Sequence, residues 1–178
     1  MKKVAALAML VCMAGALVVA AERIVTHPAE PYLKRLFPSA VAFSPFGGTP
    51  LHYTAYAADP KANPSAAPLG YVFWTTDVVP QEYAYHGPLH ILVGMDTSGI
   101  ISGAIVVYHS DPYGYFSVEP PEFAAQFKGK SIRAPFQVGV DIQAVSRASI
   151  SIASGTRAIR DSARIIARQF LDPNAVKR

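Results

Sequence analysis

We expect an α+β fold: a single domain with a twisted antiparallel sheet, short helices and a C-terminal amphipathic helix. Short runs rich in β-branched and aromatic residues occupy the middle of the chain, and a turn-forming tetrapeptide separates two of them. Apolar residues then recur at helical spacing near the C-terminus. Strands followed by a terminal helix favour an antiparallel sheet that helices cover.

The chain begins with the pattern of a targeting segment. Lys2 and Lys3 precede an uncharged apolar run, residues 4–21, which ends in Ala20 and Ala21. This pattern is typical of a secretory signal peptide and predicts cleavage near those alanines and a periplasmic location. Because the run almost reaches bilayer-spanning length, an uncleaved anchor is the alternative, and only that form would attach to a membrane.

Composition excludes several functions. Cys12, in the targeting segment, is the only cysteine of the 178 residues, so the exported part has no disulfide, thiolate metal site, iron–sulfur cluster or cysteine nucleophile. The formal net charge is +4 and falls by two without Lys2 and Lys3, which argues against nucleic acid as a partner. The remaining residues, about 155, can bury one core.

The elements before the centre are short. Residues 31–38 carry four apolar or aromatic side chains and predict a short amphipathic turn or helix that packs on the body. Residues 51–57 predict a short strand. Residues 59–68 hold three prolines among small and polar residues, which is the composition of a loop.

The centre predicts three strands and a short helix. Residues 70–76, 89–95 and 100–108 have strand composition, and residues 96–99 (Asp-Thr-Ser-Gly) suit a tight hairpin turn. An aromatic, proline-rich connection follows over residues 112–121. The spacing then predicts a short helix over 122–127, ended by Gly129.

The last element is an amphipathic helix that Asp172 and Pro173 end. Its apolar stripe consists of Ile159, Ala163, Ile166 and Phe170. A second, basic stripe consists of Arg157, Arg160, Arg164 and Arg168. We interpret these arginines as a solvated face, with the docking of an acidic partner as the other interpretation.

Directly before this helix, residues 145–151 form a candidate anion site. Ser146, Ser149 and Ser151 place three hydroxyls within six residues. The amides at a helix start and the positive end of the helix dipole favour an anion there. Ordinary helix capping predicts the same residue types, so local chemistry leaves both interpretations open.

A series of short motifs runs from Gly70 to this segment, and as an ordered set over roughly 100 residues it is more specific than any of its pieces. The motifs are Gly70-Tyr71-Val72-Phe73, Thr76-Asp77-Val78-Val79-Pro80, Tyr85-His86-Gly87-Pro88, Ile91-Leu92-Val93-Gly94-Met95-Asp96, Gly99-Ile100-Ile101, Gly103-Ala104 and His109-Ser110-Asp111-Pro112. In this order they resemble the FMN-binding domain of NosR-type accessory proteins of nitrous-oxide respiration and of RnfG-type redox subunits. The resemblance implies a division into a targeting segment (1–21), a packing segment and loop (22–69), an FMN-binding domain (70–172) and a tail (173–178).

In that family the attachment motif is Asp-x-x-Ser/Thr-Gly-Ala-Thr/Ser. A flavin transferase moves FMN from FAD onto its last hydroxyl as a phosphoester. The resemblance implies Ser149 as the acceptor, with Ser146 and Ala148 at their expected positions. The candidate cofactor-binding residues of this segment are Ser146, Arg147, Ala148, Ser149, Ile150 and Ser151.

Two positions depart from the motif. Arg147 occupies the glycine position, and Gln143 occupies the acid position, with Asp141 two residues upstream. The arginine is unfavourable if the loop needs a positive φ or close approach of the transferase. A guanidinium beside a phosphate, however, forms bidentate, charge-assisted hydrogen bonds that hold FMN without a covalent bond. Covalent and non-covalent FMN therefore both remain open.

The aromatic residues and histidines give further candidates. Tyr113, Tyr115 and Phe116 supply either flat apolar partners for a flavin ring or ordinary packing. For the strand residues Tyr71 and Phe73 we expect core packing. Tyr83 and Tyr85 belong to the same dense aromatic region. His86 and His90 flank Gly87-Pro88, so their spacing fixes no ligand geometry and polar histidines are the default; His109 belongs either to the flavin site or to a turn cap.

The resemblance implies an exported flavoprotein that carries electrons for a membrane or periplasmic respiratory system, or takes part in maturing its reductase. Its implied partners are a flavin transferase and a redox partner protein or respiratory complex. We assign no catalytic residue and no metal ligand, because no spacing reveals a convergent acid–base pair. The alternatives are a flavin-free binding or regulatory module of the same fold, and a flavin enzyme with its own small substrate.

Overall fold

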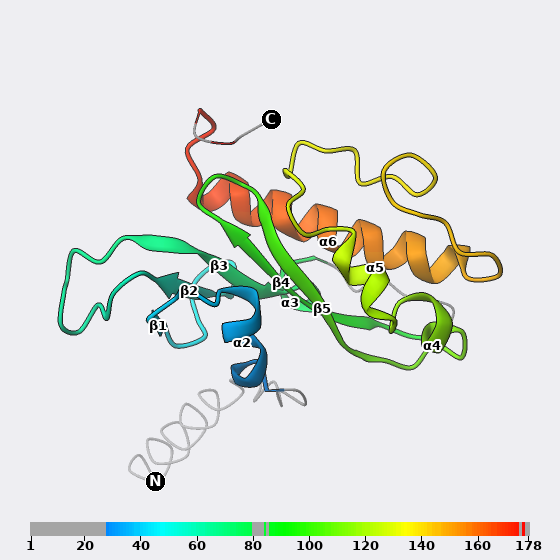
Figure 1. Ribbon diagram of the computed structural model, residues 1–178, viewed down its shortest axis with the longest axis horizontal. Coiled ribbons are helices and arrows are strands. Elements are labelled where there is room, and N and C mark those ends of the chain that lie inside the picture. Colours follow the sequence, from blue (N-terminus) through cyan, green and yellow to red (C-terminus); the bar gives the residue numbers. More distant parts are fainter. Residues whose placement is uncertain (1–27, 80–83, 85, 175, 177–178) are drawn as a thin grey trace, which may run out of the picture.

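The computed structural model describes residues 28–79, 84, 86–174 and 176 (Figure 1). The expected targeting segment and the aromatic residues Tyr83 and Tyr85 lie outside the described residues. Five strands form one antiparallel sheet in which each strand pairs with its neighbour along the chain, in the order β1-β2-β3-β4-β5. The predicted fold class, a single α+β domain with short helices and a long C-terminal helix, is confirmed.

The elements follow the expected order with a few shifted boundaries. In chain order they are α2 (Glu30–Leu36), β1 (Ala42–Phe43), β2 (Tyr53–Tyr56), β3 (Pro68–Trp74), α3 (Thr75–Val78), β4 (Leu89–Asp96), β5 (Ile101–His109), α4 (Gly114–Ser117), α5 (Pro121–Ala125) and α6 (Ser149–Phe170). The strand predicted over residues 70–76 was wrong at its end, because Thr75 and Thr76 begin α3. The connection over 112–121 holds the short helix α4, which composition did not indicate.

The turn between β4 and β5 is confirmed in detail. Asp96 Oδ1 accepts hydrogen bonds from the amides of Ser98 and Ile100 at 2.8 and 2.9 Å and from the Ser98 hydroxyl at 2.7 Å. Gly99 has a φ of +77°, which glycine adopts without a Cβ clash. The side chain of Asp96 therefore fixes the turn that aligns the two longest strands.

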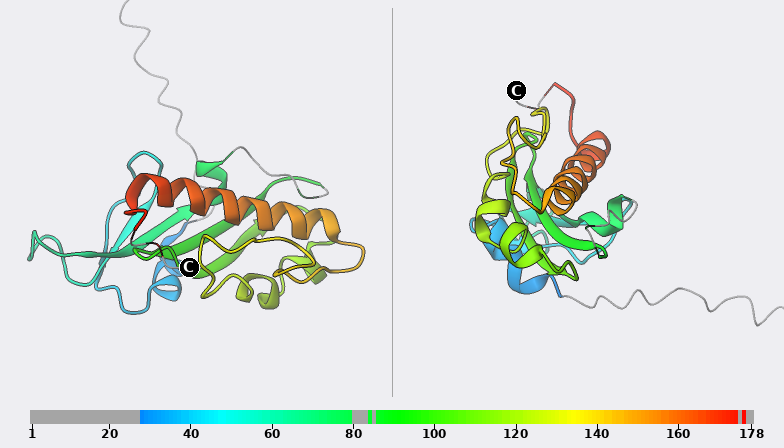
Figure 2. Two further views of the ribbon diagram at one scale, coloured as in Figure 1. Left: turned by 90° about the horizontal axis from the view of Figure 1, so that it is seen from above. Right: turned by 90° about the vertical axis from the view of Figure 1, so that its right-hand side faces the viewer.

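The sheet is covered on both faces (Figure 2). Along β3, successive side chains point to opposite faces, so Tyr71 and Phe73 join the core beneath α6 while Val72 and Trp74 pack toward α2. The expected core packing of Tyr71 and Phe73 is thus observed. Of the helices in the described part of the chain, none combines the length and apolar composition needed to cross a membrane.

The helix α6 supplies the largest part of the core on its face of the sheet. The predicted apolar residues Ile159, Ala163 and Ile166 are fully buried. Phe170 stacks on Tyr71 with ring centroids 4.9 Å apart. The helix ends where Leu171 adopts an extended conformation ahead of Pro173, as the sequence predicts.

Candidate functional site

Three of the sequence motifs meet at the end of the molecule where α6 begins (Figure 1). The hydroxyl of Ser110 donates to the carbonyl oxygen of His86 at 2.9 Å. One residue on, the buried carboxylate of Asp111 accepts a short hydrogen bond from the Ser151 hydroxyl in α6. The same carboxylate accepts from the amide of Tyr113 at 2.9 Å. Asp111 therefore ties the turn after β5 to the first turn of α6.

Two glycines allow this close assembly. Gly87 has a φ of +142°, and a Cβ there would collide with the Ser110 hydroxyl. Gly114, at the start of α4, lies so close to the His109 ring that a Cβ would overlap it. Both segments therefore need glycine to bring the strand ends together.

An open hollow of about 460 Å³ lies beside the first turn of α6. Ser149 and Arg147 are exposed on its wall, whereas Ala148 and Ser151 are buried behind it. Ser146 and Tyr115 are exposed nearby but are not among its lining residues. The residues that line the hollow are Tyr113, Arg147, Ala148, Ser149, Ile150 and Ser151.

The start of α6 has uncapped amide groups. Ser149 is the first helical residue, and the carbonyl of Ala148 accepts the first helical hydrogen bond, from Ile152, at 3.0 Å. The N-cap residue is Ala148, which provides no side-chain cap hydrogen bond, and no serine occupies this position. The serines therefore do not act as ordinary helix caps, and the amides of the first turn have no partner within the helix. Such amides attract an anion.

Arg147 is one of two non-glycine residues with a positive φ in the described chain, at +69°. This left-handed conformation costs an L-residue roughly 1–2 kcal/mol relative to glycine. A positive φ is the backbone conformation that favours glycine and is unfavourable for arginine. The attachment motif has glycine at this position. Arg147 nevertheless lines the hollow together with Ser149, and both residues are exposed.

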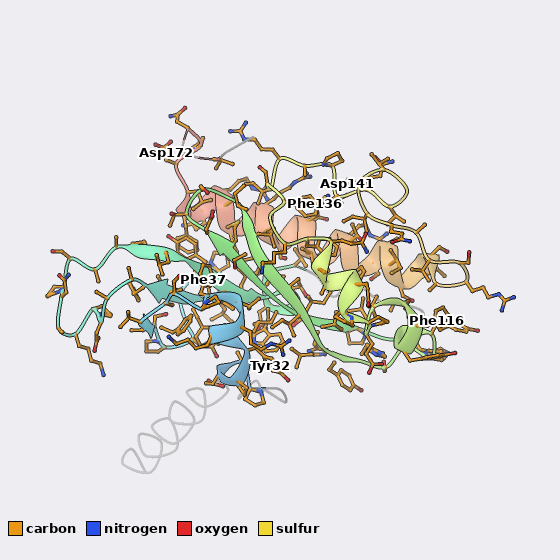
Figure 3. The ribbon with its side chains drawn as sticks, viewed as in Figure 1. Tyr32, Phe37, Phe116, Phe136, Asp141 and Asp172 are labelled. Atoms are coloured by element: carbon orange, nitrogen blue, oxygen red, sulfur yellow. The ribbon has the colours of Figure 1, made fainter. Side chains whose placement is uncertain are left out.

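Asp141 does not reach the hollow. Its carboxylate accepts from the amides of Gln137 and Phe136 at 2.7 and 3.2 Å and lies 3.3 Å from the Lys130 ammonium (Figure 3). Burial works to raise the pKa of Asp141, but the Gln137 amide, the Lys130 ammonium and the Phe136 amide together hold that pKa below its usual value. This carboxylate shapes the loop before α6.

Gln143, at the acid position of the motif, supplies no carboxylate and does not line the hollow. Gln143 is exposed, and its backbone N–H donates to Gln126 Oε1 at 2.6 Å. The carboxylate that contacts the α6 start is Asp111, which the site prediction omitted. The sequence signal for Asp111 was its place in the His-x-acid-Pro motif. Spacing alone, however, does not predict that Asp111 contacts Ser151.

The histidines lie in polar or packing positions. His109 Nε2 is 3.4 Å from Glu119 Oε2, and the ring does not line the hollow. His90 packs its ring edge-on against Tyr108, its cross-strand neighbour, at 5.5 Å. Among the residues that the structure describes, no three histidine, cysteine, aspartate or glutamate side chains gather into a possible metal site.

The loop aromatics form a small cluster at the rim. Tyr115 is 68% exposed and packs edge-on against Phe116 at 4.9 Å, and Tyr113 contacts the same ring at 6.0 Å. Of the three, only Tyr113 lines the hollow. It is 40% exposed, so its ring has surface left to cover a ligand.

No protein-family model matches the chain, and no curated protein matches it. The functional assignment therefore rests on the hollow itself. Amides, a guanidinium and a hydroxyl are suited to an anionic group. Tyr113 and Ile150, the latter 53% exposed, are suited to a flat apolar body. A ligand with both parts fits these residues better than an anion alone.

Proposed function

We propose that this chain is an exported, periplasmic flavoprotein that holds one FMN beside the first turn of α6. The observation that carries the proposal is the hollow, because Ser149, Arg147 and Tyr113 line it together. The resemblance to the FMN-binding domain family supports the same position, since its motif puts the acceptor hydroxyl at Ser149. The left-handed φ of Arg147, at the glycine position of the motif, also supports it.

Each residue of the hollow has a role in this proposal. The first amides of α6 and the Arg147 guanidinium bind the phosphate, and Ser149 either hydrogen-bonds to it or carries it as a phosphoester. Tyr113 and Ile150 contact the ring. Asp111 holds the turn after β5 against the first turn of α6. It therefore fixes the two sides of the hollow relative to each other. Bound FMN supplies one- and two-electron redox chemistry, and the protein orients it.

The wider role, electron transfer or an accessory function in respiration, is what the resemblance implies. With one cysteine, in the targeting segment, it carries no iron–sulfur cluster of its own. Electron transfer or an accessory role in a periplasmic respiratory system therefore requires a separate redox partner. Covalent attachment requires a flavin transferase that uses FAD, releases AMP and leaves FMN on Ser149 Oγ.

The second candidate is a flavin-free binding or regulatory module of the same fold. The engagement of Asp141 by Lys130 and two backbone amides favours it. With Gln143 exposed, the acid of the attachment motif has no equivalent at the hollow. A transferase that needs this acid would leave Ser149 unmodified.

Intact mass and visible absorbance of the full chain, exported by a host that has a flavin transferase, separate these functions. A covalent FMN adds its mass and stays with acid-precipitated protein, whereas a non-covalent FMN is released into the supernatant. Ser149→Ala removes the covalent FMN, and the matched control Ser65→Ala, at an exposed serine outside the motif and the hollow, keeps it. Colourless protein that also binds no added FMN contradicts the proposal and supports the flavin-free module.

A further inference from the structure

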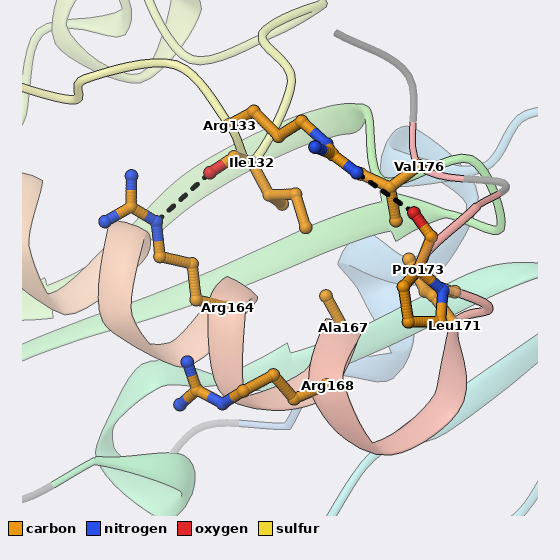
Figure 4. A pocket seen from close by; sticks show the side chains of 8 residues that line it. All are labelled: Ile132, Arg133, Arg164, Ala167, Arg168, Leu171, Pro173 and Val176. Carbon is orange, nitrogen blue, oxygen red and sulfur yellow. Dashed lines mark hydrogen bonds between the residues drawn. The ribbon is translucent and has the colours of Figure 1, made fainter.

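A second hollow lies near the C-terminal end of α6, far from the first turn (Figure 4). Its volume is about 230 Å³. Figure 4 shows Ile132, Ala167 and Val176 turned toward one another, from the loop before α6, the helix itself and the tail. Leu171 and Pro173 complete the apolar floor. The space suits a short aliphatic chain.

The polar side chains on this hollow are all guanidinium groups: Arg133, Arg164 and Arg168. Arg164 donates to the carbonyls of Ile132 and Ala134 at 3.1 and 2.9 Å. Arg133 donates to the carbonyl of Pro173 at 2.9 Å. A guanidinium has five N–H donors, so both retain donors beyond these bonds.

Arg168 is the third cation of the hollow and differs from the other two. It is exposed and lies one helical turn beyond Arg164, on the same side of α6 (Figure 4). In the described part of the chain, no acidic side chain is among the lining residues. The hollow thus combines an apolar floor with three arginines among its lining residues.

We propose that this hollow binds an aliphatic carboxylate. The alkyl chain lies among Ile132, Ala167 and Val176, and the carboxylate lies at the rim between Arg164 and Arg168. Burial of the methylene groups favours binding, and the planar fork of arginine matches the two oxygens of a carboxylate. A cationic or neutral ligand of the same length lacks the second contribution. The site is independent of the FMN proposed at the other end of the helix.

Titration of the full chain with sodium octanoate, followed calorimetrically, tests the proposal. Octylammonium is the charge control, and hexanoate and butanoate report on chain length. We expect octanoate to bind and octylammonium not to bind. Each methylene removed weakens binding by about fourfold, the change that corresponds to about 0.8 kcal/mol per buried methylene.

Two matched variants locate the carboxylate. Arg168→Gln removes the exposed guanidinium and weakens octanoate binding by about fivefold to tenfold. Arg157→Gln removes an exposed arginine of the same helix about 16 Å away along its axis and leaves the binding unchanged. The proposal is overturned if octanoate does not bind, if octylammonium binds equally well, or if both variants weaken octanoate to the same extent.

Discussion

At its first turn α6 exposes Ser149 and Ile150, whereas further along Ile159, Ala163 and Ile166 are buried against the sheet. One helix therefore has two functions along its length. The later turns supply core contacts and hold the fold. The first turn is fixed by Ala148, Ser151 and Ile152, all buried, which leaves the side chains of Ser149 and Ile150 available to a ligand.

The arginines show the same division. Arg147, before the helix, is exposed and has a left-handed backbone conformation, whereas Arg164 joins α6 to the carbonyls of Ile132 and Ala134. Arg160 pairs with its neighbour Asp161 at 2.7 Å. The interpretation of the basic stripe as a solvated face was wrong for Arg164, because a helical period cannot distinguish a solvated arginine from one that satisfies loop carbonyls.

The largest expected effect comes from one substitution made at both ends of α6. Ile159→Ala removes a fully buried side chain and should lower the free energy of unfolding by about 2–5 kcal/mol. Ile150→Ala removes a side chain that is 53% exposed and should change it by less than about 0.5 kcal/mol. Urea unfolding of both variants measures the difference. Equal losses would mean that the first turn is part of the core.

Ser151→Ala is the next largest change. It leaves the buried Asp111 carboxylate without its hydroxyl donor, so we expect a loss of about 1–3 kcal/mol in the free energy of unfolding. The matched control Ser149→Ala, two residues earlier and exposed, should cost less than about 0.5 kcal/mol. If the two serines behave alike in thermal or urea unfolding, Asp111 does not hold the helix start.

Asp141 gives a smaller, pH-dependent effect. Because its pKa is lowered in the folded protein, the carboxylate stabilises the fold above its unfolded pKa, and that contribution is lost as the pH falls through the folded pKa. We expect Asp141→Asn to cost about 1 kcal/mol at pH 7, and this difference from the parent chain to shrink over the range from pH 7 into acid. Unfolding curves across this range measure the gap. If the difference in the free energy of unfolding persists in acid, the loss comes from the shape of the asparagine side chain and not from the missing charge.

The sequence predicted the elements whose signals are local. The hairpin at Asp96 and the apolar period of α6 were correct because turn chemistry and helical spacing are properties of neighbouring residues. Thr75 and Thr76 were misplaced, since β-branched residues favour strands but here follow the end of a buried strand and turn into α3.

The sequence predicted the segment that carries the candidate site. It did not predict the contacts that build the site. The sequence singled out residues 146–151 and the aromatic loop, and Tyr113 lines the hollow with residues 147–151. The contact between Asp111 and Ser151 joins residues 40 positions apart. Such a contact depends on how β5 and α6 pack, and sequence spacing carries no information about that packing.

The smallest expected effect, and the one that bears most directly on the hollow, is that of Arg147→Gly. Glycine removes the left-handed strain but gains freedom in the unfolded chain, so the free energy of unfolding should rise by only about 0.5–1 kcal/mol. Arg147→Ala keeps the Cβ and should give no such gain. Urea unfolding of the two variants tests the conformation. In a host with a flavin transferase, Arg147→Gly restores the glycine of the motif, so the amount of covalent flavin should rise. If the variant instead binds added FMN more weakly and forms no covalent product, the role of the Arg147 guanidinium is to bind the phosphate.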